Sequence, residues 1–522
     1  MMARNSIGVV FGETGSLEFK FAVADSQAVK RSDYVKVWHE SDGWVLAQIV
    51  SITKSSDAYS LNGAISATDG AKIYDTDEKI VAKANVIGSR DRQGLLRSPK
   101  TPFSPGDNVY EADKEMIGSV LGIGHDGAYI GLLEGCDVAV YLDVDKLVRT
   151  HCSILARTGS GKSYTTGVII EELLEHDVPL LIIDPHGEYV SLKYLNSDRK
   201  QQSLMARFGI NPRGYGSQVT VYTPASLTLN PDADKVFRLD EINLSAMDLA
   251  QMLPGDLTNT QMGVLYQAIN KAKDKKELYT IDDIIGAIAN SKSGAKWGVI
   301  SALEALRETA ILSSNPTTID ELIQKGSASV IDMKGVVPEL QGIIVARLCM
   351  DLFEERKRGK IPPAMLIVEE AHRFCPERGY SKAASTDILR TIASEGRKFG
   401  LGLLVVSQRP ARIDKNVLSQ CNTQIIMKVT NPNDLRAIGK SIEGFSSELE
   451  EEVKRLPPGV ALLVNNDIER PVLVDIRVRK SQHGSSESPG IIGATHRGST
   501  CDTEKKSAND TFFRKVFGGE NR

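Results

Sequence analysis

Ser153-Ile-Leu-Ala-Arg-Thr-Gly-Ser-Gly-Lys-Ser-Tyr164 is the most informative stretch of this chain. In it, a short apolar run enters a loop with two glycines, and a Lys-Ser pair then opens a helical run from Thr165 to His176. This order suits a nucleoside triphosphate, because the loop turns backbone N–H groups towards phosphate oxygens and the helix N-terminus adds partial positive charge. The stretch therefore predicts an ATP site.

The residues of this loop have separate expected roles. Lys162 should reach the β- and γ-phosphates, and the Ser163 hydroxyl should bind Mg²⁺. The loop departs from G-x-x-x-x-G-K-[ST] only where Ala156 replaces the first glycine, and alanine fits there if its φ is negative. A chance glycine turn is the alternative, which the register of Gly-Lys-Ser disfavours. The residues expected to hold the nucleotide are Thr158, Gly159, Ser160, Gly161, Lys162, Ser163 and Tyr164.

Bulk composition limits the class of protein. At 522 residues the chain is too long for one ordinary domain. Its net charge of −4 does not indicate a nucleic-acid binder, so positive charge for DNA or RNA would have to be gathered in a groove or pore. The six cysteines are scattered, which favours reduced intracellular thiols over a disulfide framework or a structural metal site. No apolar run approaches the roughly 20 residues of a membrane helix, so we expect a cytoplasmic protein with no membrane partner.

The N-terminal region is rich in strand-like segments. Five β-branched or aromatic runs alternate with turn-rich segments and predict a small antiparallel β-barrel over residues 1–100. Such barrels bind oligonucleotides in some proteins and act as assembly collars in others, and both roles stay open. The aromatic residues alternate with polar neighbours, so burial in the core is favoured over a stacking platform. These aromatics are Phe19, Phe21, Tyr34, Trp38 and Trp44.

The middle of the chain divides by composition and periodicity. Residues 101–150 are rich in Gly, Pro and Asp and are expected to form a connector. Strand-like runs alternate with helical ones over 151–234 and 329–479, which predicts an α/β domain with a mainly parallel sheet. Between these halves, residues 235–328 show amphipathic helical patterns and are interpreted as a helical insertion. The insertion could carry specificity or be a packing appendage.

The C-terminal residues 480–522 have the composition of a disordered tail, because Ser, Gly, Thr and charged residues dominate. Thr511–Phe517 is the exception and contains three phenylalanines. It is either a docking peptide that orders on a partner or a tail with stray aromatics.

Two adjacent carboxylates follow the apolar run at 364–368. At a strand end beside a phosphate loop, one acid can orient the water shell of Mg²⁺ and the other can polarise the attacking water. Glu369 is assigned to the metal and Glu370 is assigned as the general base. Asp184 also ends a strand-like run and competes for the metal, but only the pair offers two successive acids. Asp184 is therefore expected to support the nucleotide site.

Two further residues are candidates for the catalytic machinery. Gln408 follows the strand-like run at 401–407, where an amide could sense the γ-phosphate or hold the lytic water. Arg397 and the neighbouring Lys398 end a helical run. They are either ordinary partners of the helix dipole or, for Arg397, an arginine finger that reaches the nucleotide of a neighbouring subunit.

Basic residues follow the same two strand ends and could hold a polynucleotide backbone without reading its sequence. Each of them singly could also be an ordinary solvated charge. The basic run at 356–360 fits a helix end better. The DNA-binding candidates are Arg373, Arg378, Lys382, Arg409, Arg412 and Lys415.

Four segments, Thr158–Ser163, Asp184–Tyr189, Val368–His372 and Ser407–Pro410, occur in an order that resembles the HerA family of hexameric DNA translocases, within the HerA/FtsK group. The resemblance covers about residues 5–480. It implies a RecA-like core, an N-terminal HAS-barrel, a four-helix insertion and a homohexameric ring with ATP between subunits. It also implies that double-stranded DNA passes through the pore.

The segment Ile7–Thr14 looks like the archaeal branch of that family. The resemblance then implies a NurA-type nuclease as partner and DNA-end resection for recombination. The family arginine near the nucleotide falls at Arg149, in a register displaced by one residue, so Arg149 is an expected nucleotide contact whose assignment stays open. The closing segment Pro471–Arg479 could cover the adenine.

These observations favour an ATP-driven ring motor that translocates on, or unwinds, duplex DNA with Mg²⁺ as cofactor. Two alternatives stay open. One is a ring ATPase that remodels or exports protein. The other is a regulatory subunit whose ATP site controls the assembly of a nuclease or defence complex.

Overall fold

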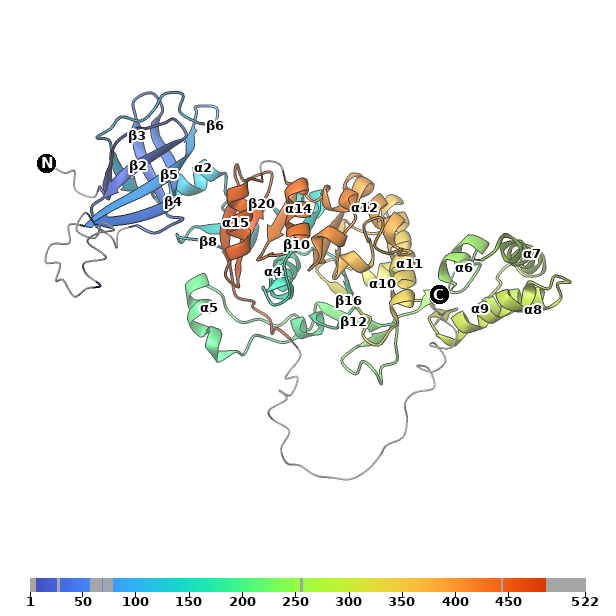
Figure 1. The fold of residues 1–522 in the computed structure, drawn as a ribbon. Helices are drawn as coiled ribbons and strands as arrows, with labels where there is room; N and C mark the ends of the chain where they lie inside the picture. Colours follow the sequence, from blue (N-terminus) through green and yellow to red (C-terminus); the bar gives the residue numbers. More distant parts are fainter. Residues whose placement is uncertain are drawn as a thin grey trace.

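The structure is a computed structural model that describes residues 6–25, 29–56, 68, 78–253, 257–442 and 445–484. Figure 1 shows a β-barrel at one end, a large sheet flanked by helices in the middle, and a group of helices at the other end. The predicted fold class, a mainly parallel α/β core with an N-terminal barrel and a helical insertion, is confirmed. Among the described residues, no helix combines the length and apolarity needed to cross a membrane.

Seven strands form the barrel sheet in the order β2-β1-β7-β3-β4-β5-β6, and an additional pairing of β2 with β5 closes it. Side chains alternate along β2, where Phe19, Phe21 and Val23 are buried and the residues between them are exposed. This alternation with a period of two places one face of the strand in the barrel core. The strands are β1 (Gly8–Val10), β2 (Glu18–Val23), β3 (Tyr34–His39), β4 (Gly43–Ser56), β5 (Glu78–Arg90), β6 (Leu96–Arg97) and β7 (Asn108–Glu111).

The expected burial of the barrel aromatics holds for three of the five. Phe19, Phe21 and Tyr34 are buried, but Trp38 and Trp44 are 55% and 41% exposed. The prediction was wrong for the two tryptophans because they face each other directly across the β3–β4 hairpin. Their ring centroids lie 5.4 Å apart in an edge-to-face arrangement, so a cross-strand contact on the outer surface takes the place of core burial.

Residues 101–150 are more than the expected connector. Strand β7 pairs with β1 and β3 and completes the barrel wall. Strands β8 (Ala128–Leu133) and β9 (Ala139–Leu142) form a hairpin that extends the central sheet. The region also holds helices α2 (Lys114–Leu121) and α3 (Val144–Thr150). Its short strands pair with residues distant in sequence, which local composition does not reveal.

The central sheet has twelve strands in the order β13-β12-β16-β11-β17-β18-β10-β19-β20-β21-β8-β9. Pairing is parallel from β13 to β19 and antiparallel from β19 to β9. The carboxyl ends of the parallel strands therefore share one edge of the sheet, called here the carboxyl edge. The strands not yet given are β10 (Cys152–Leu155), β11 (Leu180–Asp184), β12 (Val219–Thr223), β13 (Lys235–Val236), β16 (Ala328–Asp332), β17 (Ala364–Val368), β18 (Leu401–Ser407), β19 (Thr423–Ile426), β20 (Val460–Val464) and β21 (Val472–Ile476).

Separate hydrophobic cores lie on the two faces of this sheet. Along β11, Leu181 and Ile183 enter one core, whereas Leu180 and Ile182 enter the other. All four are fully buried, which explains why the strand reads as a continuous apolar run. The flanking helices are α4 (Lys162–Glu175), α5 (Gln202–Phe208), α10 (Ile319–Leu322), α11 (Pro338–Lys357), α12 (Thr386–Phe399), α13 (Lys415–Leu418), α14 (Pro432–Ser441) and α15 (Ser447–Arg455), with short 3₁₀ segments η2 (Tyr189–Lys193), η3 (Arg199–Gln201), η4 (Ala371–Arg373) and η5 (Pro410–Arg412).

Four helices form the insertion, and a two-stranded parallel pairing of β14 (Leu239–Asp240) with β15 (Leu312–Ser313) lies at its base. Capping boxes begin three of the helices, at Ser245, Thr258 and Thr280, as the Ser and Thr positions in the sequence suggest. The helices are α6 (Ala246–Met252), α7 (Asn259–Lys275), α8 (Ile281–Ala289) and α9 (Lys296–Glu308).

The beginning of the expected C-terminal tail is packed against the core. The hydroxyl of buried Ser481 donates to Glu171 of α4 at 2.6 Å, and Lys480 Nζ lies 2.5 Å from Glu175. The prediction of disorder from residue 480 was therefore wrong for 480–484, because Ser481 and Lys480 bind carboxylates of α4, which composition cannot indicate. Residues 485–522, including Thr511–Phe517, lie outside the described residues.

Substitution of Gly131 tests the pairing that joins β8 to the C-terminal strand β21. Gly131 has a φ of +155°, and a Cβ there would lie 2.0 Å from the carbonyl oxygen of Asp475. We expect Gly131→Ala to destabilise the protein by about 1–3 kcal/mol and to lower the midpoint of thermal unfolding. Gly118→Ala on α2 is the control, since its Cβ would meet no atom within 4 Å and should leave the midpoint unchanged or raise it. Equal midpoints for the two variants would contradict the observed register.

Candidate nucleotide-binding site

The glycine loop joins the carboxyl end of β10 to α4, as the sequence predicts. Gly159 and Gly161 have φ values of +78° and +102°, which only glycine adopts easily. Ala156, which stands where the usual glycine is missing, does not have a positive φ. Its Cβ is therefore tolerated at this position of the loop. The loop therefore has the backbone that the phosphate-binding prediction requires.

Two neighbouring strands hold this loop in place. The Arg157 N–H donates to the carbonyl oxygen of Lys428, just beyond β19, at 2.9 Å. On the other side, the Thr158 hydroxyl donates to Oε1 of Gln408, the residue that follows β18. Gln408 thus contacts the glycine loop directly, in a position from which its amide can respond to the occupant of the loop.

Lys162 lies between the two predicted carboxylates. Its Nζ donates to Oε1 of Glu369 and, at 2.9 Å, to Oε1 of Glu370, and all three side chains are at most 10% exposed. Burial lowers the pKa of Lys162, but the attraction of both carboxylates outweighs it, so the net pKa is raised and the ammonium stays charged. Burial raises the pKa of Glu369 to about 7, against the opposing effect of Lys162.

Glu370 has an unusual backbone conformation for its residue type. Its φ of +50° and ψ of +43° place it in the left-handed region, where a side chain is rarely found and costs of order 1–3 kcal/mol. Such backbone strain is often found at functional sites. The conformation turns the chain sharply after β17, so that Glu369 and Glu370 both reach Lys162.

Asp184 holds the turn that follows β11. Its carboxylate accepts N–H groups from His186, Gly187 and Tyr189, at 3.2, 2.9 and 2.9 Å, and is fully buried. Burial raises its pKa to about 7, and the neighbouring Asp332 adds to this effect. Asp184 therefore supports the site by shaping the turn after β11, and its oxygens are occupied by this turn.

Through that turn, Asp184 places Tyr189 next to the metal candidate. The Tyr189 hydroxyl donates to Oε2 of Glu369 at 3.0 Å, while Oε1 of the same carboxylate binds Lys162. Glu369 is thereby fixed at both oxygens. Ser163 follows Lys162, the residue bound to Glu369, on the first turn of α4. Its hydroxyl and the Glu369 carboxylate are both ligand types suited to Mg²⁺.

Tyr164 is already engaged by the C-terminal segment. Its hydroxyl donates to Gln201 at 2.9 Å and accepts the N–H of Arg479 at 2.8 Å, and its ring lies edge-to-face with His483. The Arg479 guanidinium packs against Gly167, where an added Cβ would lie 2.5 Å away. The last described residues thus contact the first two turns of α4, close to the phosphate loop.

Arg149 and Arg397 lie at the opposite edge of the sheet from the glycine loop. Arg149 precedes β10, whose four residues span about 13 Å, and Arg397 precedes β18, the parallel neighbour of β10. Both are exposed. The expectation that Arg149 contacts the nucleotide was wrong for the same chain, because the strand separates them.

The predicted DNA-binding loops are paired with each other. Pro376, after β17, bridges to Ile413, after β18, and the Glu377 N–H donates to the carbonyl oxygen of Arg412 at 2.8 Å. The Arg412 guanidinium lies 5.5 Å from the ring centroid of exposed Tyr380. Five of the six candidates are exposed, at Arg378, Lys382, Arg409, Arg412 and Lys415, and Arg373 is half-buried.

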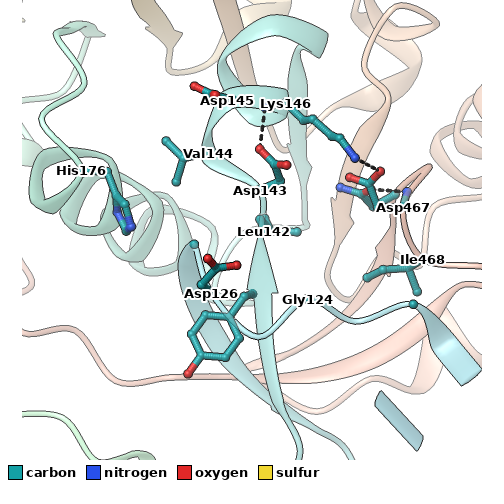
Figure 2. Close-up of a pocket in the computed structure, with 14 residues that line it drawn as sticks. Gly124, Asp126, Leu142, Asp143, Val144, Asp145, Lys146, His176, Asp467 and Ile468 are labelled. Atoms are coloured by element: carbon teal, nitrogen blue, oxygen red, sulfur yellow. Dashed lines mark hydrogen bonds and ion pairs between the residues drawn. The ribbon is translucent and has the colours of Figure 1, made fainter. Parts of the chain in front are cut away.

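A hollow of about 590 Å³ lies at the other end of α4, beside its C-cap residue His176. Figure 2 shows carboxylates around it, with Lys146 turned towards Asp467 and Asp143 capping the start of α3. The fourteen residues of α4 separate this hollow from the glycine loop by about 21 Å. Its acidic lining disfavours a triphosphate, so the glycine loop is the better nucleotide site. The lining carboxylates are Asp126, Asp143, Asp145 and Asp467.

Sequence reasoning gave no role to three residues that the structure brings into the site, Tyr189, His372 and Ser407. All three fall in segments already recognised as unusual, directly at or after the carboxyl ends of β11, β17 and β18. The signal that could have identified them is their position in those segments. Which of them contacts which carboxylate depends on the strand order, which sequence did not provide.

Comparison with known proteins identifies relatives of this chain. Residues 128–352 match the protein family described as "Helicase HerA, central domain". A Methanocaldococcus jannaschii protein named "probable helicase" is 29% identical, with 92% of each chain covered. The DNA double-strand break repair helicase HerA of Pyrococcus furiosus is 27% identical, covering 92% of this chain and 93% of its own. The DNA double-strand break repair helicase HerA of Saccharolobus solfataricus is 26% identical, covering 93% of this chain and 95% of its own.

Among solved structures, VirB4 of Thermoanaerobacter pseudethanolicus overlaps 68% of this chain and 97% of its own. Its sequence identity is 14% and the TM-score is 0.49, which is too low to support a functional argument.

The buried carboxyl of Asp184 predicts a pH effect on stability. Its pKa is raised above the usual value near 4 to about 7, so the folded protein keeps a proton that the unfolded chain releases in this range. Stability should therefore fall as pH rises from about 4 to about 7, by up to about 1.4 kcal/mol per pH unit for one proton. Asp184→Asn cannot titrate and should flatten this fall, measured as thermal midpoints at several pH values without nucleotide.

The matched control for this experiment is Asp145→Asn, an exposed carboxylate of the acidic hollow. It should leave the slope of stability against pH as in the unchanged protein. Loss of stability at all pH values in Asp184→Asn would report only the changed hydrogen bonds of the turn. An unaltered slope in Asp184→Asn would mean that this carboxyl does not hold the proton.

Proposed function

Because residues 128–352 match the family described as "Helicase HerA, central domain", we propose that this chain is an ATP-driven translocase or helicase acting on double-stranded DNA. The main structural support is the convergence of Lys162, the Glu369–Glu370 pair and Gln408 on one loop at the carboxyl edge. These groups come from three separate strands, and together they offer phosphate binding, metal binding and general-base chemistry.

ATP binding would change the partners of Lys162. Its ammonium is the natural counter-ion of the phosphates, and moving it there releases Glu369 and Glu370. Glu370 can then accept the proton of the attacking water, while Ser163 and Glu369 would hold Mg²⁺. When bound, Mg²⁺ would neutralise phosphate charge. Gln408, already in contact with Thr158, is placed to sense the phosphates.

The position of Arg397 and Arg149 supports action across subunits. Both are exposed and lie at the sheet edge opposite the glycine loop of their own chain, so they are available to a neighbouring copy. We propose a homohexameric ring in which Arg397 supplies the arginine finger and Arg149 assists it. Such a contact is worth about 10³-fold or more in rate where it operates.

The paired loops after β17 and β18 are the proposed DNA track, since five of their six basic candidates are exposed. The relatives named as DNA double-strand break repair helicases suggest a role in end resection. The proposed partner is a NurA-type nuclease, and the proposed compartment is the cytoplasm.

Duplex DNA should stimulate ATP hydrolysis by this protein. Arg412→Ala should weaken that stimulation and lower the salt dependence of DNA binding by about one unit of the log–log slope, because one phosphate contact is lost. Steady-state phosphate release and DNA binding at several salt concentrations measure these effects. Arg358→Ala, at the exposed end of α11 on the opposite sheet edge, is the control and should change neither.

The same assay separates the alternatives. Stimulation by unfolded protein and not by duplex DNA would favour a protein remodeller. Indifference to both would favour a regulatory ATP site and would contradict the motor.

Mixed rings test the trans arginine. Lys162→Ala subunits should be inactive because they cannot hold the phosphates, and Arg397→Ala subunits should be strongly impaired. In a mixture, an Arg397→Ala subunit can receive Arg397 from a Lys162→Ala neighbour, so ATPase activity should exceed the sum of the two separate preparations. Lys398→Ala, next to Arg397 on the same exposed turn, is the control and should be active alone. A mixture that shows only the summed activity would disprove the shared site.

A further inference from the structure

We propose that His372 is a positioning residue that connects the general base Glu370 to the DNA-track loop after β18, so that DNA on this loop governs water activation. The inference rests on the proposed function and adds to it a physical link between the two sites. It follows from the contacts of one imidazole ring, which lies on η4, two residues after Glu370.

The ring nitrogen Nδ1 of His372 has two polar neighbours. It lies 3.2 Å from Oε2 of Glu370 and 3.1 Å from Oγ of Ser407, the last residue of β18. The same Ser407 oxygen accepts the backbone N–H of Arg409 at 2.9 Å. A continuous series of polar contacts therefore runs from the proposed base to the backbone of Arg409, the first basic residue of the loop after β18.

The Oε2 oxygen of Glu370 lies at one end of this series of polar contacts. Oε1 is held by Lys162, whereas Oε2 is buried and accepts no hydrogen bond from any described residue. His372 is its close polar neighbour. A buried carboxylate oxygen without a hydrogen-bond donor is costly, so a shift of the ring towards or away from it changes where Glu370 rests. The left-handed backbone of Glu370 adds strain that a small movement could release.

His372 is suited to a polar link and not to a permanent ion pair. Its side chain is 15% exposed, and burial lowers its pKa below the ordinary histidine value, against the raising effect of Glu370. Lys162, Arg373 and Arg412 also face it and lower that pKa further. A neutral ring can exchange Glu370 and Ser407 as partners without leaving a charge behind.

The loop after β18 can transmit movement because it is a connected unit. Besides the bridge between Pro376 and Ile413, the Asp414 N–H donates to the carbonyl oxygen of Cys375 at 2.8 Å. Arg409 therefore lies between Ser407 and a pair of loops joined by backbone hydrogen bonds. Gln408 lies between Ser407 and Arg409, so three successive residues contact His372, contact the glycine loop and begin the basic loop after β18.

The test compares His372→Ala, Ser407→Ala, the double variant and His372→Asn in the full chain, with and without duplex DNA. His372→Ala should lower kcat in the presence of DNA about tenfold, with KM for ATP changed less than about twofold, because the base is misplaced while nucleotide binding stays. His372→Asn keeps a polar group near the position of Nδ1 and should recover most of this loss. The double variant should lose no more than either single variant, because both interrupt one chain.

The outcomes separate the inference from the proposed function. If the unchanged protein is stimulated by duplex DNA but His372→Ala is stimulated equally, the positioning role is refuted and the motor stands. The positioning role would also be refuted if the losses of kcat multiply in the double variant. The same holds if His372→Asn does not recover kcat in the presence of DNA. Absence of DNA stimulation in the unchanged protein would refute both. Glu370→Gln is the reference. A chain without its base should show no DNA stimulation of ATP hydrolysis, whether residue 372 is His or Ala.

Discussion

A buried ammonium shared by two carboxylates is the constraint on which this site depends. Lys162 cannot lie between Glu369 and Glu370 unless β10 and β17 end at the same edge of one sheet, with β18 between them. Charges removed from water need a partner, and here each charge finds it on an element distant in sequence. The resting site is thus a cluster of paired charges that an incoming polyanion must rearrange, which ties occupancy of the loop to release of the carboxylates.

The sheet connects the change of partners at Lys162 to the loops that lie beyond its carboxyl edge. The segment after β18 touches the glycine loop through Gln408 and the base through Ser407 and His372. The parallel strands are buried on both faces, so they resist independent sliding and act as a rigid frame. The loops beyond the carboxyl edge lie outside this frame, and the proposed chemistry and the proposed track lie together there.

Much of this arrangement could be read from sequence, because its signals are local and periodic. A short stretch of sequence is enough to recognise each of three features. These are the glycine loop, the strand before Glu369–Glu370 and the four inserted helices. Predictions failed where distant pairing decides the outcome. Trp38 and Trp44 cover each other across a hairpin, and β7 closes a barrel from outside its predicted range. Arg149 was expected at the nucleotide from the family resemblance, although it lies on the far side of β10 from the loop.

The pairing of β8 with β21 also bears on synthesis of the chain. Val474 is made about 340 residues after its partner Leu133, which at about 5–20 residues per second takes roughly 17–70 s on the ribosome. The barrel strands β1 to β7 are complete long before that time and can fold while the hairpin of β8 and β9 still lacks its neighbour. The nascent protein must therefore carry an unmatched sheet edge until its last strand emerges, a period in which shielding by a chaperone would have most effect.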